Sequence, residues 1–374
     1  MTDQVAAKEH KLDAGLDTEG VLDEDTLLKV ENLHTYLATE AGLVKAVNGV
    51  DITVKKEEVL GVVGESGCGK SITALSIMQL LPQPHGKIHQ GKILFRTRQG
   101  RVIDLAGQDP TGQVMRRIRG NEIAVIFQEP MTSLNPVYTV GYQIVEAIML
   151  HRQVTRKQAW RMAEEMLAKV GIPSPKQRVG EYPYQMSGGM RQRVMIAMAL
   201  CCSPSLLIAD EPTTALDVTI QAQILDLMMS LQEEFRMSIM MITHNLGVVG
   251  RICDNVAVMY MGKIIEYTDV RTLYHNPAHP YTIGLFNSIP KLGENKQRLV
   301  PIKGVVPDPV HLPEGCSFKD RCPAATEKCS EEPPFVSVGR DHFARCWHPR
   351  AKAVDHLESP EALDGRKEQD HGKT

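Results

Sequence analysis

One eight-residue segment constrains the fold of this chain more than any other. The sequence GESGCGKS at 64–71 fits the pattern G-x-x-x-x-G-K-S, and it lies between an apolar run at 59–64 and a helical pattern at 71–81 that a proline closes. In such a unit the glycines let backbone N–H groups turn toward a phosphate, and the helix N-terminus adds partial positive charge. We expect the Lys70 ammonium to reach the β- and γ-phosphates of a nucleotide and the Ser71 hydroxyl to ligate Mg²⁺. The predicted site comprises Gly64, Glu65, Ser66, Gly67, Cys68, Gly69, Lys70, Ser71 and Ile72.

Short apolar runs of the same kind recur further along the chain. SLLIAD at 205–210 and SIMMITH at 238–244 are continuous and apolar, as in strands buried on both faces of a parallel sheet, and a helical pattern at 219–235 separates them. This alternation predicts a parallel sheet with helical crossovers, hence an α/β fold. Nearer the N-terminus, 27–37 and 44–58 alternate in part between apolar and polar residues, which predicts an antiparallel β-layer.

The length and the charge narrow the classes of protein. The 374 residues carry a net charge of −3, whereas a nucleic-acid binder is expected to have a basic excess, so no nucleic-acid partner is predicted. The N-terminus lacks a basic region followed by an apolar stretch, and no apolar run approaches the roughly 18–20 residues that cross a bilayer. We therefore expect a protein made in the cytosol that reaches a membrane only by docking on an embedded partner.

Changes in composition divide the chain into four parts. Residues 1–26 are acidic and poor in aromatic and β-branched residues, which predicts a disordered tail. Periodic sequence fills 27–270 and includes two amphipathic helices between about 142 and 170. Residues 271–350 lose this periodicity and become rich in proline and cysteine, which predicts an irregular appendage. Residues 351–374 are expected to be a charged tail.

Two adjacent acids end one of the predicted buried strands. They are Asp210 and Glu211, in the sequence LLIADEP. Burying an unpaired carboxylate is costly, so acids at the C-terminal end of a strand indicate a cation or a catalytic role. We expect Asp210 to hold Mg²⁺ and Glu211 to polarise the water that attacks the γ-phosphate. His244 ends the next strand, where it is placed to hydrogen-bond the γ-phosphate or that water.

The segment shortly before these acids resembles a known family. YQMSGGMRQRVMIAMAL at 184–200 is similar to the signature segment and following helix of the ATP-binding-cassette (ABC) family, with MSGGM in place of the common LSGGQ. Gln128 in IFQEP resembles the family's Q-loop glutamine, and Tyr36 is placed like the aromatic residue that stacks on adenine. These motifs follow one another in the family's order over about 27–265.

The resemblance implies a P-loop NTPase of the ABC cassette type. Its parts would be a RecA-like parallel-sheet core, an antiparallel β subdomain, an α-helical subdomain at about 110–200 and a small cysteine-rich C-terminal extension. It also implies a dimer that sandwiches two ATP, each bound by one subunit and by the signature of the other. The implied signature residues are Ser187, Gly188, Gly189 and Met190, and the D-loop is Ala215, Leu216 and Asp217. The implied catalytic set is Lys70, Gln128, Glu211 and His244, and the Mg²⁺ set is Ser71, Gln128 and Asp210.

The C-terminal part resembles one branch of this family. NPAHPYTIGLFNSIP at 276–290, followed by four clustered cysteines, is similar to the ATPases of oligopeptide and dipeptide importers. This resemblance implies an identical or paralogous second ATPase, two transmembrane permease subunits and an extracytoplasmic substrate-binding protein, with the chain at the cytoplasmic face of the membrane. Nickel, glutathione or oligosaccharides stay open as other cargoes. A soluble ABC ATPase acting on nucleic acid or ribosomes is the alternative, which the single cassette and slightly negative charge argue against.

The four clustered cysteines point to a metal. Cys316, Cys322, Cys329 and Cys346 are spaced C-x5-C-x6-C-x16-C, and in a cytosolic protein such a cluster more often holds a metal than a disulfide. Zinc sites favour C-x2–4-C pairs, whereas irregular spacing with a Cys-Pro step suits an iron–sulphur cluster better. The subfamily resemblance likewise implies [4Fe–4S]. Zinc and metal-free cysteines stay open as alternatives, and a structural role is expected in preference to redox sensing.

Overall fold

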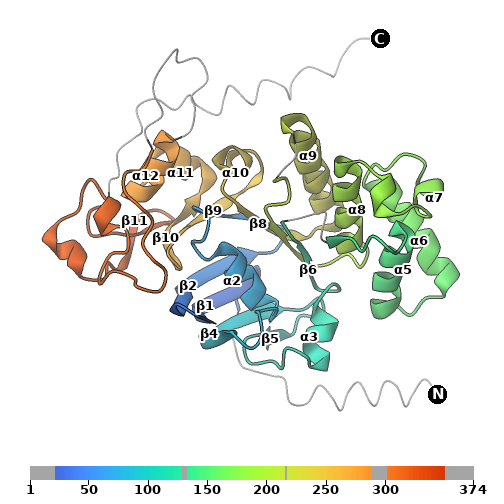
Figure 1. Ribbon diagram of the computed structural model, residues 1–374, viewed down its shortest axis with the longest axis horizontal. Coiled ribbons are helices and arrows are strands. Elements are labelled where there is room, and N and C mark those ends of the chain that lie inside the picture. The colour runs from blue at the N-terminus through green and yellow to red at the C-terminus, as the bar shows by residue number, and fades with distance from the viewer. Residues whose placement is uncertain (1–21, 129–132, 215–216, 289–300, 350–374) are drawn as a thin grey trace, which may run out of the picture.

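Two β-sheets with flanking helices make up the protein (Figure 1). The computed structural model describes residues 22–128, 133–214, 217–288 and 301–349; the charged tail expected at 351–374 and most of the tail expected at 1–26 lie outside these ranges. The smaller sheet is antiparallel, with strands in the order β2-β1-β4-β5. Its strands are β1 (Thr26–Thr39), β2 (Gly42–Lys55), β4 (Gly86–Arg96) and β5 (Val102–Asp104). The antiparallel layer predicted from the alternating sequence is confirmed.

The larger sheet carries the catalytic motifs and has eight strands in the order β11-β12-β10-β9-β3-β8-β7-β6. Its parallel part comprises β3 (Val59–Val63), β6 (Ile123–Ile126), β7 (Leu206–Asp210), β8 (Ser238–Thr243) and β9 (Asn255–Tyr260). Its antiparallel part comprises β10 (Lys263–Asp269), β11 (Phe335–Gly339) and β12 (His342–Arg345). Every residue of β3, β7 and β8 is buried, as their continuous apolar runs predicted.

Helices cover the sheet and form a separate group at one end. They are α2 (Lys70–Ile77), α3 (Gln113–Ile118), α5 (Val140–His151), α6 (Arg156–Lys169), α7 (Pro175–Arg178), α8 (Gly188–Leu200), α9 (Val218–Phe235), α10 (Leu246–Ile252), α11 (Val270–His275) and α12 (Pro280–Asn287). The group at the right of Figure 1 consists of α5 to α8. Its helix α6 starts at a capping box in which Thr155 and Gln158 satisfy each other's backbone N–H groups. The two amphipathic helices predicted between about 142 and 170 are α5 and α6.

The helix after the phosphate loop is shorter than predicted. The sequence pattern indicated a helix to residue 81, but α2 ends at Ile77 and Gln79 takes a left-handed backbone conformation with φ +52°. The Gln79 side chain donates to the carbonyls of Leu105 and Ala106, at 2.8 and 3.1 Å. These tertiary hydrogen bonds stabilise the early end of the helix, and local sequence patterns do not report them.

The C-terminal part of the chain adds its own strands to the larger sheet. After α12 it forms two short 3₁₀ helices, η2 (Lys319–Arg321) and η3 (Glu327–Ser330), and the hairpin β11–β12, whose second strand pairs with β10. This hairpin was not predicted from the sequence, which indicated an irregular appendage. The fully buried carboxylate of Glu266 in β10 fixes the junction. It accepts hydrogen bonds from the backbone N–H groups of Ala278 and His279, at 2.6 and 2.8 Å, and lies 2.8 Å from His342 Nε2.

Candidate active site and cysteine pocket

The phosphate loop turns tightly between β3 and α2. Gly69, the residue before α2, has φ +109°, and a Cβ at this position would lie 2.2 Å from the Ala46 carbonyl oxygen. A Cβ at Gly64 would lie 2.2 Å from the Met259 carbonyl oxygen. Neither position therefore accepts a larger residue, because both contacts are with backbone atoms. The loop is thus clamped between β2 and β9, and the strand–loop–helix context predicted for it is present.

Lys70 fills the centre of this loop. Its buried ammonium donates to the carbonyl oxygens of Gly64 and Glu65, at 2.9 and 3.0 Å. An ammonium group held in this way has donors directed into the loop, where phosphate oxygens could exchange with the carbonyls as acceptors.

Asp210 and Ser71 form the part of the site that suits a divalent cation. Their side chains are hydrogen-bonded to each other, and Asp210 Oδ1 is buried without a hydrogen-bonding partner among the described residues. Burial raises the pKa of Asp210 above its ordinary value, although the bond with Ser71 acts in the opposite direction. A Mg²⁺ ion would satisfy this orphaned oxygen and offset the cost of burying the charge. The donor set of carboxylate and hydroxyl oxygens fits that ion.

Three of the predicted catalytic residues meet at Glu211. Its Oε2 accepts from Gln128 Nε2 at 3.0 Å and from the Thr214 hydroxyl at 2.8 Å, while its Oε1 lies 3.0 Å from His244 Nδ1. Glu211 has φ +48°, a strained backbone conformation for a residue with a side chain. The contact of Thr214 with Glu211 was not predicted from the sequence, although the spacing of three residues within one turn could have indicated it.

The charge state of Glu211 follows from these contacts. Burial raises the pKa of this carboxyl, but hydrogen bonds from His244 and Thr214 outweigh burial, so the pKa of Glu211 lies below its ordinary value. The group is therefore ionised at neutral pH and is able to accept a proton from a water molecule.

The signature residues lie at the start of α8, a helix whose Gln192 side chain donates to the carbonyl of Pro212, the residue after Glu211. Ser187 caps α8, its hydroxyl accepting from the Met190 N–H at 3.3 Å, and α8 belongs to the helical group at the right of Figure 1. Ser187 and Gly188 are exposed and a Cβ at Gly188 would meet nothing within 4 Å, whereas a Cβ at Gly189 would lie 3.3 Å from Ile220 on α9. The use of these signature residues by another subunit stays a prediction.

The predicted roles of Tyr36 in adenine stacking and of the D-loop residues stay predictions, but the structure shows where Tyr36 and Asp217 lie. Tyr36 lies half-buried on β1, with its ring 4.6 Å from that of His89. Asp217 caps α9 by accepting from the Ile220 N–H at 2.9 Å. Ala215 and Leu216 lie outside the described residues.

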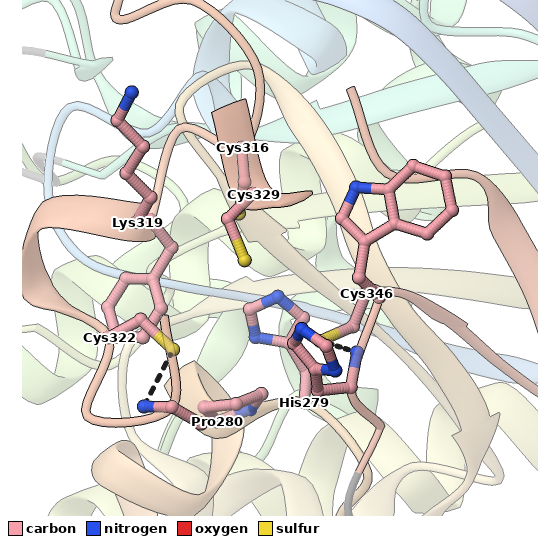
Figure 2. A pocket seen from close by; sticks show the side chains of 11 residues that line it. His279, Pro280, Cys316, Lys319, Cys322, Cys329 and Cys346 are labelled. Atoms are coloured by element: carbon pink, nitrogen blue, oxygen red, sulfur yellow. Dashed lines mark hydrogen bonds between the residues drawn. The ribbon is translucent and has the colours of Figure 1, made fainter. Parts of the chain in front are cut away.

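The four cysteines of the C-terminal part line one pocket (Figure 2). The Cys322 sulfur accepts from the Ala324 N–H at 3.4 Å, and the Cys346 sulfur accepts from the His348 N–H at 3.3 Å. Burial, together with the smaller effect of the other three cysteines, raises the pKa of Cys346 to about 11, although the hydrogen bond from the His348 N–H acts in the opposite direction. Within the described part of the chain, no group of three or more His, Cys, Asp or Glu side chains is arranged to hold a metal ion. The pocket therefore gathers the thiols without placing them around a single ion.

Comparison with known proteins shows which family the chain belongs to. Residues 47–214 match the ABC transporter family, and residues 265–329 match the C-terminal region of oligopeptide/dipeptide transporters. The dipeptide transport ATP-binding protein DppD of Bacillus subtilis is 46% identical over 341 residues, which cover 91% of this chain and 100% of that protein. The chain belongs to the ABC transporter family. Within that family it is an ATP-binding subunit of the oligopeptide/dipeptide type, and it is an ATPase.

A further relative and a solved structure are consistent with this family assignment. The oligopeptide transport ATP-binding protein AppD of Bacillus subtilis is 49% identical, over 86% of this chain and 96% of its own. The fold is that of a solved dimer of the ATP-binding cassette MJ0796 in a post-hydrolysis state with ADP and phosphate. That structure has a TM-score of 0.57 and 24% identity, and the match covers 66% of this chain and 99% of that one. None of the helices described for the ABC ATPase is long and apolar enough to cross a membrane.

Contacts between the C-terminal part of the ABC ATPase and its phosphate loop were not predicted from the sequence. The Tyr281 hydroxyl accepts from the Glu65 N–H, and the Arg321 guanidinium pairs with the Glu65 carboxylate. These residues are 216 and 256 positions apart from Glu65. No local pattern links them, so a signal for these contacts was absent from the single sequence.

Proposed function

We propose that this ABC ATPase drives the import of dipeptides and oligopeptides across the cell membrane. The match of residues 265–329 to the C-terminal region of oligopeptide/dipeptide transporters carries the proposal. The cassette matches the ABC transporter family as a whole, whereas this region matches the family described as oligopeptide/dipeptide transporters. The names of the relatives, which are dipeptide and oligopeptide transport proteins, support the same cargo. Nickel, glutathione or oligosaccharides are the alternative cargoes.

The proposed assembly places the chain at the cytoplasmic face of the membrane. It would contain two transmembrane permease subunits, an extracytoplasmic substrate-binding protein and a second ATPase, identical or paralogous. The solved cassette dimer of the same fold supports the pairing of two ATPases. In the proposed pair, the loop around Lys70 of one subunit and Ser187, Gly188 and Gly189 of the other enclose each ATP.

The proposed hydrolytic step uses Glu211 as general base. Its ionised carboxylate accepts a proton from the attacking water, and His244 holds that carboxylate in place. When bound, Mg²⁺ would neutralise charge on the β- and γ-phosphates, held by Ser71, Asp210 and Gln128. Gln128 hydrogen-bonds Glu211 at 3.0 Å, and its resemblance to the family's Q-loop glutamine implies that it would also couple ATP binding to the membrane subunits. Hydrolysis then reopens the pair of cassettes.

Uptake in the host cell tests the cargo. Deleting the gene for this chain should abolish uptake of a radiolabelled dipeptide and tripeptide, and the unchanged gene should restore it. A gene carrying Lys70→Ala should fail to restore uptake, because the phosphates lose their ammonium partner. Normal peptide uptake in the deletion strain, together with lost nickel or oligosaccharide uptake, would contradict peptide import and leave the ATPase role intact.

We also propose that the four pocket cysteines hold a [4Fe–4S] cluster. A tetrahedral zinc ion with Zn–S bonds of about 2.3 Å needs its four sulfurs within about 3.8 Å of one another. A cluster of four irons and four sulphides spans a wider set of thiolates, which suits a pocket where the thiols are gathered but not placed around one ion. Backbone N–H groups directed at the Cys322 and Cys346 sulfurs suit such ligands. When bound, the cluster would cross-link loops that have little core of their own.

Metal analysis of anaerobically purified protein tests the cluster. The unchanged chain is expected to contain about four irons and to absorb broadly in the visible range. Cys316→Ser and Cys346→Ser should each lose this iron, because each removes one of four thiolate ligands. Cys253→Ser, which alters a cysteine outside the pocket, is the matched control and should keep it. Zinc in place of iron, or iron retained by both pocket variants, would contradict the proposal.

A further inference from the structure

We propose that Arg321 is a positioning residue for the phosphate loop. Together with Tyr281 it holds Glu65, the second residue of that loop, and so sets the loop conformation that receives ATP. The inference concerns residues of the C-terminal part that no motif assigns to the ATP site. It rests on the ATPase activity of the chain and does not require the cysteines to hold a cluster.

The Arg321 guanidinium forms a two-point contact with Glu65. Its Nη1 lies 2.7 Å from one carboxylate oxygen and its Nη2 lies 3.0 Å from the other. The Arg321 side chain is 4% exposed and that of Glu65 is 29% exposed, so water screens this pair only partly. Arg321 also donates to the Lys303 carbonyl and the Tyr260 hydroxyl, each at 3.3 Å. These bonds fix the planar guanidinium in one orientation, which makes the pair geometrically specific.

Tyr281 holds the backbone of the same loop residue. Its hydroxyl accepts from the Glu65 N–H at 2.9 Å. The ring is fully buried and packs 4.7 Å from the Tyr260 ring and 5.4 Å from the Phe318 ring, measured between centroids. A phenol enclosed by two aromatic rings has little freedom to move. Glu65 is therefore held at both its N–H and its carboxylate by residues from outside the loop.

Holding Glu65 affects the group that binds phosphate. The Glu65 carbonyl accepts from Lys70 Nζ at 3.0 Å, so the position of this residue sets part of the cradle around the ammonium. A carboxylate inside a phosphate loop would also repel the charge of ATP. The pairing with Arg321 offsets the charge of this carboxylate and ties it to the C-terminal part. Both effects favour ATP binding.

Arg321 lies in the segment that lines the cysteine pocket. It ends η2 and directly precedes Cys322, and Phe318 lines the pocket while packing 5.3 Å from the Tyr260 ring. The wall of the pocket and the support of the phosphate loop are thus one stretch of chain. If the cysteines bind the proposed cluster, the same binding orders Arg321; that link alone rests on the proposed function.

Equilibrium binding and amide exchange of the full-length chain test the inference. Arg321→Met is expected to weaken binding of Mg–ATP about tenfold, as read by displacement of a fluorescent ATP analogue, because a charged two-point contact is lost. Amide hydrogen exchange across residues 64–69 of the nucleotide-free protein should become faster. The maximal rate of ATP hydrolysis should change less than about threefold, since Glu211 and His244 are untouched. Arg321→Lys should recover part of the binding, as it keeps the charge and loses the fork.

A matched ion pair provides the control. Glu332→Gln breaks the pair between Glu332 and Lys263 at 2.6 Å, which also joins the C-terminal part to β10 but does not contact the phosphate loop. This variant should leave ATP binding and loop exchange unchanged. Equal weakening of ATP binding by Glu332→Gln and Arg321→Met would overturn the inference, because any loosening of the C-terminal part would then suffice.

Two milder variants keep the test decisive if Arg321→Met fails to fold. Glu65→Gln removes the charge from the more exposed partner, and Tyr281→Phe removes only the hydroxyl acceptor. Each should accelerate exchange in the loop and weaken Mg–ATP binding by about two- to fivefold. Unchanged binding and exchange in folded variants would overturn the inference. Their iron content, measured in parallel, reports separately on the proposed cluster.

Discussion

Glu211→Gln is expected to lower the rate of ATP hydrolysis by about two to four orders of magnitude while ATP binding stays near that of the unchanged protein. The amide keeps the size of the side chain but cannot accept a proton from water. The groups that contact the phosphates and Mg²⁺ in the proposed site, Lys70, Ser71 and Asp210, are not altered. Phosphate release at saturating ATP and equilibrium nucleotide binding measure the two effects separately.

A surface variant and a pH series control this experiment. Glu234→Gln removes an exposed carboxylate that pairs with Lys169, and it should leave the rate unchanged. Because the pKa of Glu211 lies below its ordinary value, this base stays ionised as the pH falls from about 8 to about 6, so its titration should not slow hydrolysis in that range. Substantial hydrolysis by Glu211→Gln would show that another group is the base.

Glu266→Ala is expected to destabilise the protein by about 3–5 kcal/mol. The substitution leaves the backbone N–H groups of Ala278 and His279 and the His342 ring without their acceptor in a fully buried place. These bonds join β10 to the turn before α12 and to β12, so the C-terminal part should loosen first. Urea unfolding in a Trp160→Phe background, where fluorescence reports on Trp347, followed in parallel by circular dichroism, measures the loss.

A conservative variant and a variant at a different ion pair serve as controls for the loss of stability in Glu266→Ala. Glu266→Gln retains a carbonyl acceptor of the same reach and should cost less than the alanine variant. Glu332→Gln, at an exposed pair on the same part of the chain, should cost less than about 1 kcal/mol. A loss below about 1 kcal/mol for Glu266→Ala would mean that water or a shifted side chain satisfies the freed groups.

The sequence predicted the parts of the fold that local pattern determines. Continuous apolar runs identified β3, β7 and β8 because a strand buried on both faces has no polar face. The meeting of Glu211 and His244 was predictable because both follow neighbouring parallel strands, whose carboxyl ends lie at the same edge of the sheet. The end of α2 was not predictable, since it depends on Gln79 reaching carbonyls some 26 residues away.

In the C-terminal part, the contacts between residues distant in sequence could not be predicted from the sequence. The cysteine spacing indicated a metal site, but only the fold brings all four cysteines to one pocket. The pairing of β12 with β10 and the contacts of Arg321 and Tyr281 join residues that are distant in sequence, and such pairs leave no periodic signal in a single chain.

The pairing of Glu65 with Arg321 also has a consequence for synthesis of the chain. The two residues are 256 positions apart, and a ribosome adds about 5–20 residues per second. The phosphate loop therefore emerges roughly 10–50 seconds before the arginine that holds it. Throughout that interval the unfinished cassette lacks part of the support for its nucleotide site. A chain that ends before residue 321 should therefore bind ATP more weakly than the full-length chain.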